Sequence, residues 1–524
     1  MHLKLPTVPQ ITATESERHA LVEHLKGMRF GLEKEGLRVV RNDAKLAQTP
    51  HPSALGSALT HPNITTDYSE ALLEFVTGTH ATPHAALAEL DGLQGYAATV
   101  LADAERIWPL SMPCWLPESD CDIPLAYYGE SHIGRLKTVY RRGLGFRYGR
   151  QMQTIAGVHF NLSFSDAFWA WRAAQDGHPD GLDPRQMRDT GYFETIRNFR
   201  RIQWILMLLT GASPAVDESF RLVATDRFQV SGRSRVAQSA TSLRMSDLGY
   251  QSTAQESINI CFNYLDTYCE SLSEAVRRPW PTYEGIGLKD EQGFKQLNTA
   301  VLQIENEYYS SIRPKRIQAA GERPVRALIN RGIEYLEVRA IDLNPYARNG
   351  ISETEAGLIT LMMTAAAVAP SPLFSDAECE AINGLNARTT WAGRRSPQRY
   401  DAKRSLYEAA IEFFDSLDAL AAMLDNAQNV TYHTDALLDA RMRLSGDCPL
   451  LSEDVEEATN NEGHLAFGLK MAELHHSTWT RYVDTSENTR LADTARASLE
   501  QESQLAAANE GTFDAFVAAY VNQP

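Results

Sequence analysis

Residues 333–341 read IEYLEVRAI, and they combine the alternation of a β-strand with an unusually polar face. Successive side chains of a strand point to opposite faces of its sheet. Leu336 and Ala340 therefore fall on an apolar face, whereas Glu337 and Arg339 share the other face. A single strand of this kind is most simply read as half-buried, with its polar side in water.

Two further segments repeat the pattern, which weakens that simple interpretation. The sequence VHFNLS at 158–163 and the sequence GLEKEGLRV at 31–39 each alternate in the same way. Their polar faces carry His159 with Asn161 and Glu33 with Glu35. Three strands that each gather ligand-type side chains on one face predict a common site on one sheet.

The residue types on these faces favour a divalent cation and a phosphate. Mg²⁺ prefers oxygen ligands, and imidazole ligands suit several related ions. The planar guanidinium of Arg339 can donate two parallel hydrogen bonds to a phosphate. Glu74 adds a carboxylate inside the apolar run 72–76, where an unpaired charge would be costly. Such a site fits phosphoryl transfer, carboxylate ligation or metal-assisted hydrolysis.

Glycine-rich phosphate loops are missing from the sequence. No GxxxxGK[ST] pattern occurs, and Gly143, Gly145 and Gly149 lack the spacing and the following lysine that such a loop needs. A nucleotide would therefore be bound through metal ions and arginines.

Composition excludes several other classes of function. The 524 residues carry a net charge of −17 and no long basic run, which argues against nucleic-acid binding. The longest apolar runs, 202–210 and 358–369, are much shorter than the ~20 residues of a membrane span, so both are expected to be buried helices. No signal peptide is visible, and the six scattered cysteines form no CxxC pair, which predicts a cytoplasmic protein with free thiols.

The pattern of expected elements changes along the chain. Strands and helices alternate up to about residue 375, with helices expected at 15–26, 83–104 and 254–275 and surface loops at 175–185 and 278–287. From residue 376 the sequence has helical periodicity almost throughout, as in 401–426, 452–474 and 488–521. We therefore predict an α+β fold, with a catalytic body over 1–375 and a helical region over 376–524 packed on it.

At this point the sequence resembles a known family, the bacterial single-function glutamate–cysteine ligases. The matching motifs include GLEKEGLRV at 31–39, ITTDYSEALLEFVT at 64–77, YRRGLGFRYG at 140–149, MQTIAGVHFNLS at 152–163, TSLRMSDLGY at 241–250, VLQIENEYYSSIRPKR at 301–316 and GIEYLEVRAIDLNP at 332–345. They occur in order from about residue 31 to residue 345, whereas the helical region matches only loosely. The resemblance implies a glutamine-synthetase-like antiparallel sheet that forms a funnel flanked by helices.

The resemblance also implies a reaction. ATP would phosphorylate the γ-carboxylate of glutamate, the amine of cysteine would displace the phosphate, and Mg²⁺ would be required, with Mn²⁺ as a substitute. Such a protein carries out the first step of glutathione biosynthesis. We further expect a monomer, feedback inhibition by glutathione, and no nucleic-acid or membrane partner.

Site residues carried over from the motifs fall into three groups. The implied metal ligands are Glu33, Glu35, Asp67, Glu74, His159 and Glu337. The implied catalytic groups are Arg244, Glu337 and Arg339. The implied substrate-binding residues are Tyr140, Arg141, Leu144, Gln153, Asn161, Arg244, Tyr250 and Tyr309, most of which would form a pocket for cysteine.

Two departures from the family pattern and two alternatives remain. Lys34 and Gly36 stand where arginine and threonine are expected, and residues 217–238 share little with the family. The alternatives are a sister ligase that uses another amine, and a nucleotide or metal sensor without turnover. We also expect His475 and His476 to be surface residues.

Overall fold

The computed structural model describes residues 3–8, 14–175, 183–221, 226–249, 253–258, 260–319, 321–394, 398–481 and 485–523. Its centre is a seven-stranded antiparallel sheet with the order β11-β12-β5-β1-β3-β2, and β4 pairs with the far end of β1. The strands are β1 (Arg29–Val40), β2 (Ile64–Thr66), β3 (Leu72–Val76), β4 (Glu105–Ile107), β5 (Gly157–Ser163), β11 (Ile312–Lys315) and β12 (Tyr335–Asp342). Two small sheets, β6-β8-β7 and β9-β10, lie outside it. They comprise β6 (Ala215–Asp217), β7 (Gln229–Ser231), β8 (Ser234–Val236), β9 (Lys289–Asp290) and β10 (Gly293–Phe294).

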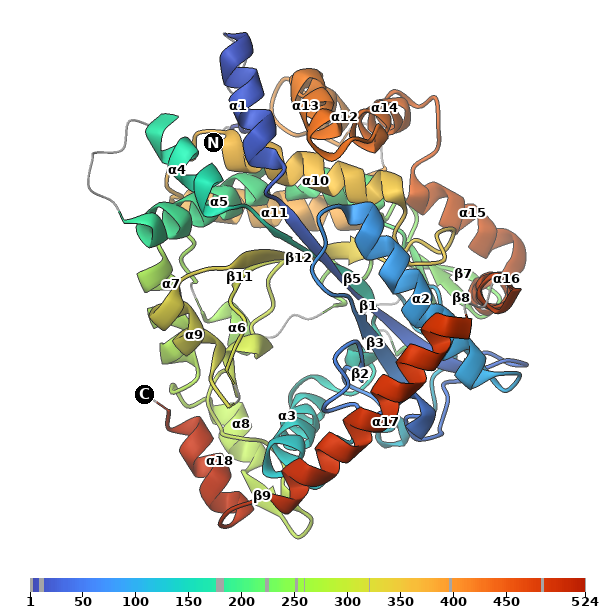
Figure 1. Ribbon diagram of the computed structural model, residues 1–524. Coiled ribbons are helices and arrows are strands. Elements are labelled where there is room, and N and C mark those ends of the chain that lie inside the picture. The colour runs from blue at the N-terminus through green and yellow to red at the C-terminus, as the bar shows by residue number, and fades with distance from the viewer. Residues whose placement is uncertain are drawn as a thin grey trace.

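Helices surround the central sheet (Figure 1). Those before residue 376 are α1 (Glu15–Leu25), α2 (Pro83–Leu101), α3 (His132–Tyr148), α4 (Asp166–Gln175), α5 (Pro184–Thr210), α6 (Thr253–Glu256), α7 (Leu265–Ala275), α8 (Pro281–Ile286), α9 (Pro324–Arg331) and α10 (Glu353–Val368). Those after it are α11 (Asp376–Ala392), α12 (Leu406–Asp415), α13 (Asp418–Gln428), α14 (Tyr432–Ser445), α15 (Leu451–Glu462), α16 (His464–Arg481), α17 (Thr485–Ala507) and α18 (Phe513–Val521). The α+β class and the helical C-terminal part are therefore confirmed.

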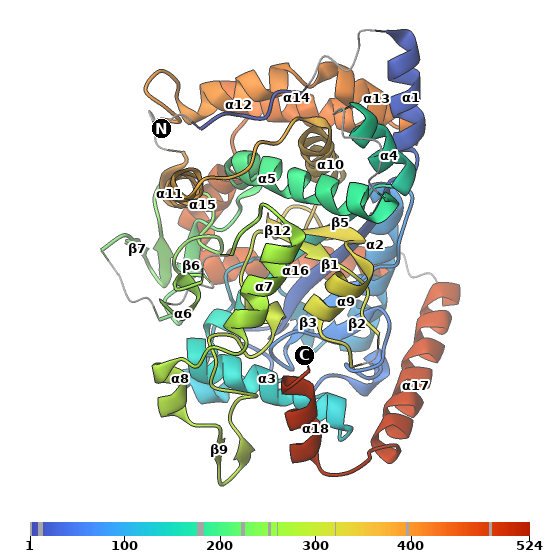
Figure 2. The ribbon, with the colours of Figure 1, turned by 90° about the vertical axis from the view of Figure 1, so that its left-hand side faces the viewer.

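The apolar face of the sheet is buried under long helices. Leu336 and Val338 on β12 and Phe160 on β5 are fully buried. Helix α5 packs against β12, and α10 packs on α5 in a second layer (Figure 2). Both apolar runs, 202–210 and 358–369, lie in these two buried helices, as predicted. Among the described residues, no helix has the length and apolar character that a membrane span requires.

The helices after residue 376 are not separate from the core. Residues from α12 to α17, such as Phe414 and Leu491, belong to the same hydrophobic cluster as the strands of the central sheet. The division of the chain at residue 375 remains a prediction.

Three local predictions were wrong. The expected helix 254–275 is two helices, α6 and α7, because the chain near Asn263 is extended and its carbonyl accepts a hydrogen bond from Arg197 on α5, at 2.9 Å. The expected loop 278–287 contains α8, which starts at Pro281 because proline fits the first helical position. His475 and His476 are buried, and His475 Nε2 lies 2.8 Å from the Pro345 carbonyl oxygen.

Lys34 and Gly36, which together form the first departure from the family pattern, lie next to each other in the structure. Lys34 lies on the back face of β1 and is only 2% exposed. A Cβ atom at Gly36 would come within 3.0 Å of Lys34 Nζ and 2.8 Å of Ile107 Cγ2. Glycine at position 36 therefore leaves room for the ammonium group of Lys34.

This buried lysine makes stability depend on pH. Burial lowers the pKa of Lys34 to about 7, so between pH 7 and its ordinary pKa near ~10.5 the unfolded chain binds more protons than the folded one. The free energy of unfolding should rise with pH over this range. Lys34→Met should stabilise the protein at pH 7, by on the order of a few kcal/mol, and should flatten that rise.

Urea unfolding at pH 7 and pH 9 measures both effects. Lys45→Met is the matched control, because Lys45 is 55% exposed and pairs with Asp43 in solvent. A Lys34→Met variant that is less stable than the parent at pH 7 would show that the ammonium group is satisfied in the fold.

Candidate active site

Four neighbouring strands, β3, β1, β5 and β12, bring most of the predicted metal-ligand residues to one face of the sheet. In the strand register, Glu33 on β1 lies opposite His159 on β5, and Glu35 lies opposite Glu74 on β3. On the other side, Glu337 on β12 lies opposite Asn161. Directly opposed residues of antiparallel strands share a face, so the pairing itself gathers these side chains.

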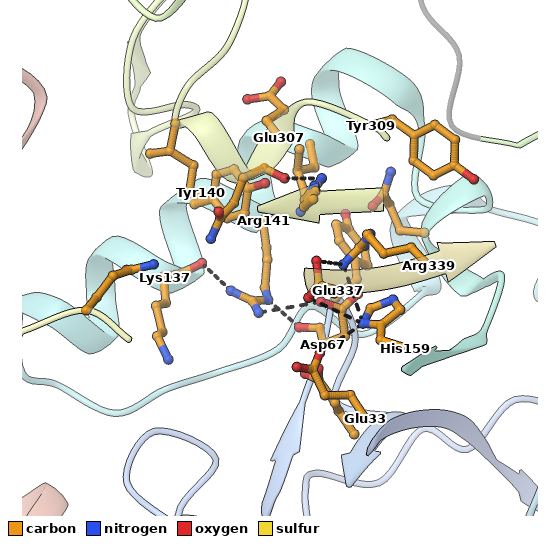
Figure 3. A pocket seen from close by; sticks show the side chains of 18 of the residues that line it. Glu33, Asp67, Lys137, Tyr140, Arg141, His159, Glu307, Tyr309, Glu337 and Arg339 are labelled. Carbon is orange, nitrogen blue, oxygen red and sulfur yellow. Dashed lines mark hydrogen bonds and ion pairs between the residues drawn. The ribbon is translucent and has the colours of Figure 1, made fainter. Parts of the chain in front are cut away.

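A bulge in β12 lies beside this cluster. The register between β12 and β5 shifts between Val338 and Ile341, and the Arg339 N–H donates to the Ser311 carbonyl at 2.8 Å. Bulges re-aim the side chains next to them. Here Arg339 points into the same cavity as Glu337, with its Nη1 3.2 Å from Glu337 Oε2 (Figure 3).

The cavity over this face has a volume of about 490 Å³. Helix α3 contributes Lys137, Tyr140 and Arg141 to the wall of this cavity (Figure 3). Twelve of the predicted site residues line it: Glu33, Glu35, Asp67, Glu74, Tyr140, Arg141, Leu144, Gln153, His159, Tyr309, Glu337 and Arg339.

Two of the predicted residues, Asn161 and Arg244, do not line this cavity. Asn161 lies beneath Glu33 and donates from Nδ2 to Glu33 Oε1 at 2.9 Å. Arg244 is buried behind Arg339 and donates to its backbone oxygen at 3.0 Å. Tyr250 lies outside the described residues.

Arg244 explains why residue 157 is a glycine. A Cβ atom at Gly157 would come within 2.2 Å of Arg244 Nη2, so any larger residue would displace the guanidinium. Arg244 also lies 3.9 Å from Asp342, which itself accepts hydrogen bonds from Ser213 and Ser242. Its position suits a residue that supports Arg339 from behind.

The carboxylates of the cavity differ in electrostatic environment. Burial disfavours the charge of Glu337, but Lys315 at 3.2 Å and Arg339 outweigh it and hold the pKa of Glu337 well below its usual range. For Glu74, burial together with the charge of Asp67 outweighs the opposing charge of Arg141 and raises its pKa well above the usual range. Burial and Asp67 likewise raise the pKa of Glu35, although His159 opposes them.

These residues fit a divalent cation. Among the described residues, Glu33, His159 and Glu337 each offer a ligand atom within 4.8 Å of the others. His159 Nδ1 lies 2.9 Å from Glu33, whereas its buried Nε2 has no hydrogen-bond partner and faces Glu35 at 3.9 Å. A cation beside Glu35 and Glu74 would offset the repulsion that raises their pKa values.

Sequence reasoning missed several residues of the cavity. Lys315 and Arg313 lie on the short strand β11, where Arg313 is directly opposite Glu337. Lys137 extends from α3, and Tyr148, Gln255 and Glu307 form a hydrogen-bonded group at the rim near Tyr309. The alternation of Arg313 and Lys315 within IRPK was the one local signal, although the strand has only four residues.

An antiparallel sheet that presents carboxylates, an imidazole and arginines to one cavity is typical of an enzyme of the phosphate-handling class. Comparison with known proteins is more specific, since residues 14–388 match the family model described as glutamate-cysteine ligase. The chain belongs to the glutamate–cysteine ligase family.

Individual relatives agree with this assignment. The chain is 43% identical to a glutamate–cysteine ligase of Pseudomonas paraeruginosa over 94% of this chain and 93% of that protein. It is also 43% identical to the one from Azotobacter vinelandii, over the same shares of both chains. A crystal structure of glutamate–cysteine ligase from Francisella tularensis in complex with AMP has a TM-score of 0.87 and 32% identity, and covers 94% of this chain and 97% of that one.

Proposed function

We propose that this protein uses ATP to join the γ-carboxylate of glutamate to the amine of cysteine, through a γ-glutamyl phosphate. The observation that carries the proposal is the cavity itself, where Arg339 and Lys315 flank a cluster of carboxylates on a glutamate–cysteine ligase fold. The AMP held by the Francisella relative supports a nucleotide as one substrate.

The reaction has two balanced steps. A γ-carboxylate oxygen of glutamate attacks the γ-phosphorus of ATP, the bond to the β-phosphate oxygen breaks, and ADP leaves. The cysteine amine then attacks the acyl carbon, loses a proton, and expels phosphate to leave the amide. A carboxylate reacts poorly with an amine because it has no good leaving group. Phosphorylation converts the γ-carboxylate into an acyl phosphate, from which phosphate leaves readily.

We assign roles to the residues by their positions. Glu33, Glu35, Asp67, Glu74, His159 and Glu337 would hold Mg²⁺, or Mn²⁺ in its place. The bound ions would neutralise charge on the transferring phosphoryl group. Arg339 would donate to phosphate oxygens with its planar fork, and Arg244 would fix its position. Asn161 would orient Glu33.

The cysteine pocket would lie between α3 and the chain around Tyr309. Tyr140, Arg141 and Leu144 face the cavity from α3, and Gln153 faces it from the following turn. Rings and an aliphatic side chain offer contact area for a thiol, and Arg141 offers a charge for the cysteine carboxylate. Tyr250, placed in this pocket by motif, lies outside the described residues.

Tyr309→Phe should affect cysteine more than the other substrates. The Tyr309 hydroxyl lies 3.0 Å from the Met245 sulfur at the rim of the cavity, where it can reach a small amino acid. Loss of one neutral hydrogen bond predicts a rise of about 3- to 10-fold in the KM for cysteine. Steady-state kinetics with each substrate varied measures this, and equal rises for all three substrates would mean that Tyr309 is structural.

The proposal also covers the cellular compartment, the oligomeric state and inhibition by glutathione. The six cysteines are free, which supports a reducing compartment such as the cytoplasm. We also propose a monomer and inhibition by glutathione, which contains the γ-glutamylcysteine unit of the product. Light scattering and inhibition by added glutathione test these two points.

The test of the function is a product assay with ATP, glutamate and a series of amines. ADP and γ-glutamylcysteine should form in equal amounts, with 2-aminobutyrate accepted more weakly and glycine least. Release of AMP and pyrophosphate, or preference for an amine other than cysteine, would overturn the assignment.

A further inference from the structure

One buried carboxylate outside the catalytic cavity has no part in the chemistry described so far. Asp342 is the last residue of β12, is only 1% exposed and does not line the cavity. Its Oδ2 accepts hydrogen bonds from the Ala212 N–H at 2.9 Å and from the Ser213 hydroxyl at 2.6 Å. Its Oδ1 accepts a hydrogen bond from the Ser242 hydroxyl at 2.9 Å.

The two serines extend this anchor to the backbone of the next residues. The Ser213 hydroxyl accepts a hydrogen bond from the Arg244 N–H at 3.3 Å, and the Ser242 hydroxyl accepts one from the Met245 N–H at 3.2 Å. Each hydroxyl thus donates to Asp342 and accepts from a backbone N–H, which uses both its proton and a lone pair. The carboxylate therefore fixes the backbone of residues 244 and 245 relative to the end of β12.

Arg244 carries this position to the phosphate side of the cavity. It is only 4% exposed, its Nη1 lies 3.9 Å from Asp342 Oδ1, and the same nitrogen donates to the Arg339 backbone oxygen at 3.0 Å. A buried guanidinium is costly unless a counter-charge accompanies it. Loss of the Asp342 charge should therefore let Arg244 shift, and the backbone of Arg339 with it.

Met245 carries the same position to the cysteine side. Its sulfur lies 3.0 Å from the Tyr309 hydroxyl and 3.3 Å from Arg244 Nη1. Tyr309 in turn lines the cavity. A shift of residues 244 and 245 should therefore change the placement of the Tyr309 ring as well.

We propose that Asp342 is a positioning residue that aligns Arg339 and Tyr309 with each other, through Ser213, Ser242 and the backbone they hold. The inference rests on the proposed function, because that function assigns Arg339 to phosphate and Tyr309 to cysteine. It adds that one carboxylate outside the cavity sets the distance between the two.

Asp342→Asn tests this role. The amide keeps the shape of the side chain, but it carries no charge for Arg244 and cannot accept hydrogen bonds at both of its ends. Misplacement of reacting groups by about 1 Å can cost about 10²-fold in rate. We expect kcat to fall by about 10- to 100-fold, and the KM for cysteine to rise by about 3- to 10-fold. The Kd of ADP should stay within about 2-fold, because ADP lacks the phosphate that Arg339 would contact.

A double variant tests whether the effect on cysteine passes through Tyr309. In Tyr309→Phe the hydroxyl contact with Met245 is already absent. Adding Asp342→Asn to this variant should raise the KM for cysteine by less than about 2-fold further, since residues that act through one another are not additive.

A second pair of substitutions keeps the test open if Asp342→Asn does not fold. Ser213→Ala combined with Ser242→Ala leaves the carboxylate in place but removes both hydroxyls that link it to residues 244 and 245. We expect kcat to fall by about 3- to 10-fold, again with the Kd of ADP within about 2-fold.

Asp217→Asn is the matched control. Asp217 is also fully buried, accepts a hydrogen bond from the Ser219 N–H at 2.9 Å and pairs with Arg233 at 2.8 Å. It does not line the catalytic cavity. Its replacement should leave kcat and the KM for cysteine within about 2-fold of the parent.

The outcomes are distinct. If kcat and the KM for cysteine of Asp342→Asn stay within about 2-fold of the parent, the inference is wrong. An equal loss of ADP binding, or a cysteine effect fully additive with Tyr309→Phe, would show that Asp342 only stabilises the fold. The parent, assayed in parallel, tests the function separately, because a parent that forms no γ-glutamylcysteine overturns the proposed function itself.

Discussion

Glu33→Gln is expected to lower turnover by about 10²- to 10³-fold while leaving the fold intact. Glu33 stands at the centre of the cluster, 2.9 Å from His159 Nδ1 and opposite it in the strand register. A glutamine has the same shape and can still accept the hydrogen bond from Asn161. It lacks the charge that a cation needs, and the loss of one preorganised electrostatic group commonly costs a rate factor of this size.

The fold should remain intact with a modest loss of stability at neutral pH, because a carboxylate whose pKa is lowered in the folded protein favours folding. Burial and the charge of Glu337 act to raise the pKa of Glu33, but the hydrogen bond and charge of His159 together with the charge of Lys315 outweigh them, and the net shift is downward. Thermal unfolding and steady-state turnover, measured on the same preparation, give both values.

Glu334→Gln is the matched control for this substitution. Glu334 lies just before β12, is 40% exposed and pairs with Arg316 at the surface. Its replacement should leave turnover within about 2-fold. Near-parent turnover of Glu33→Gln at low magnesium would contradict the assignment of Glu33 as a cation ligand.

Added magnesium is expected to restore part of the turnover of Glu337→Gln but none of the turnover of Arg339→Lys. Glu337 is paired with both Lys315 and Arg339, each at 3.2 Å. In Glu337→Gln the positive charges of Lys315 and Arg339 next to the metal site are no longer balanced by a carboxylate. The apparent magnesium affinity should therefore fall. Excess magnesium should therefore restore part of the turnover of Glu337→Gln.

Magnesium should not restore Arg339→Lys. An ammonium group is a point charge and cannot replace the two parallel hydrogen bonds that a guanidinium donates to a phosphate. Turnover should remain about 10²-fold below the parent at every magnesium concentration. Titration of both variants with magnesium measures the pair together, and rescue of the arginine variant alone would show that the two roles are reversed.

Alternation along single strands predicted much of the site. The polar faces of 31–39, 158–163 and 333–341 are adjacent in the sheet, and the register sets Glu33 against His159 and Glu337 against Asn161. Local alternation sufficed here because a strand fixes the direction of every second side chain. The order of the strands could not be obtained in this way, since it depends on pairing between segments far apart in the chain, such as β5 and β12.

Other parts of the site depend on tertiary packing and carry little local signal. Lys137 and Tyr520 reach the cavity from helices whose sequences are ordinary amphipathic patterns, and only the packing of α3 against α18 brings them together. His475 was expected at the surface, but α16 packs against α2 and β4 and so buries it. The bulge that aims Arg339 is likewise a property of the β12–β5 pairing and not of the segment IEYLEVRAI.

The central claim is that the γ-carboxylate of glutamate is phosphorylated before cysteine attacks. The most direct measurement uses glutamate labelled with ¹⁸O in the γ-carboxylate, together with ATP and cysteine. An acyl phosphate path transfers one labelled oxygen to each phosphate released, which mass spectrometry of the phosphate detects. Unlabelled phosphate alongside γ-glutamylcysteine formation would contradict the proposed mechanism.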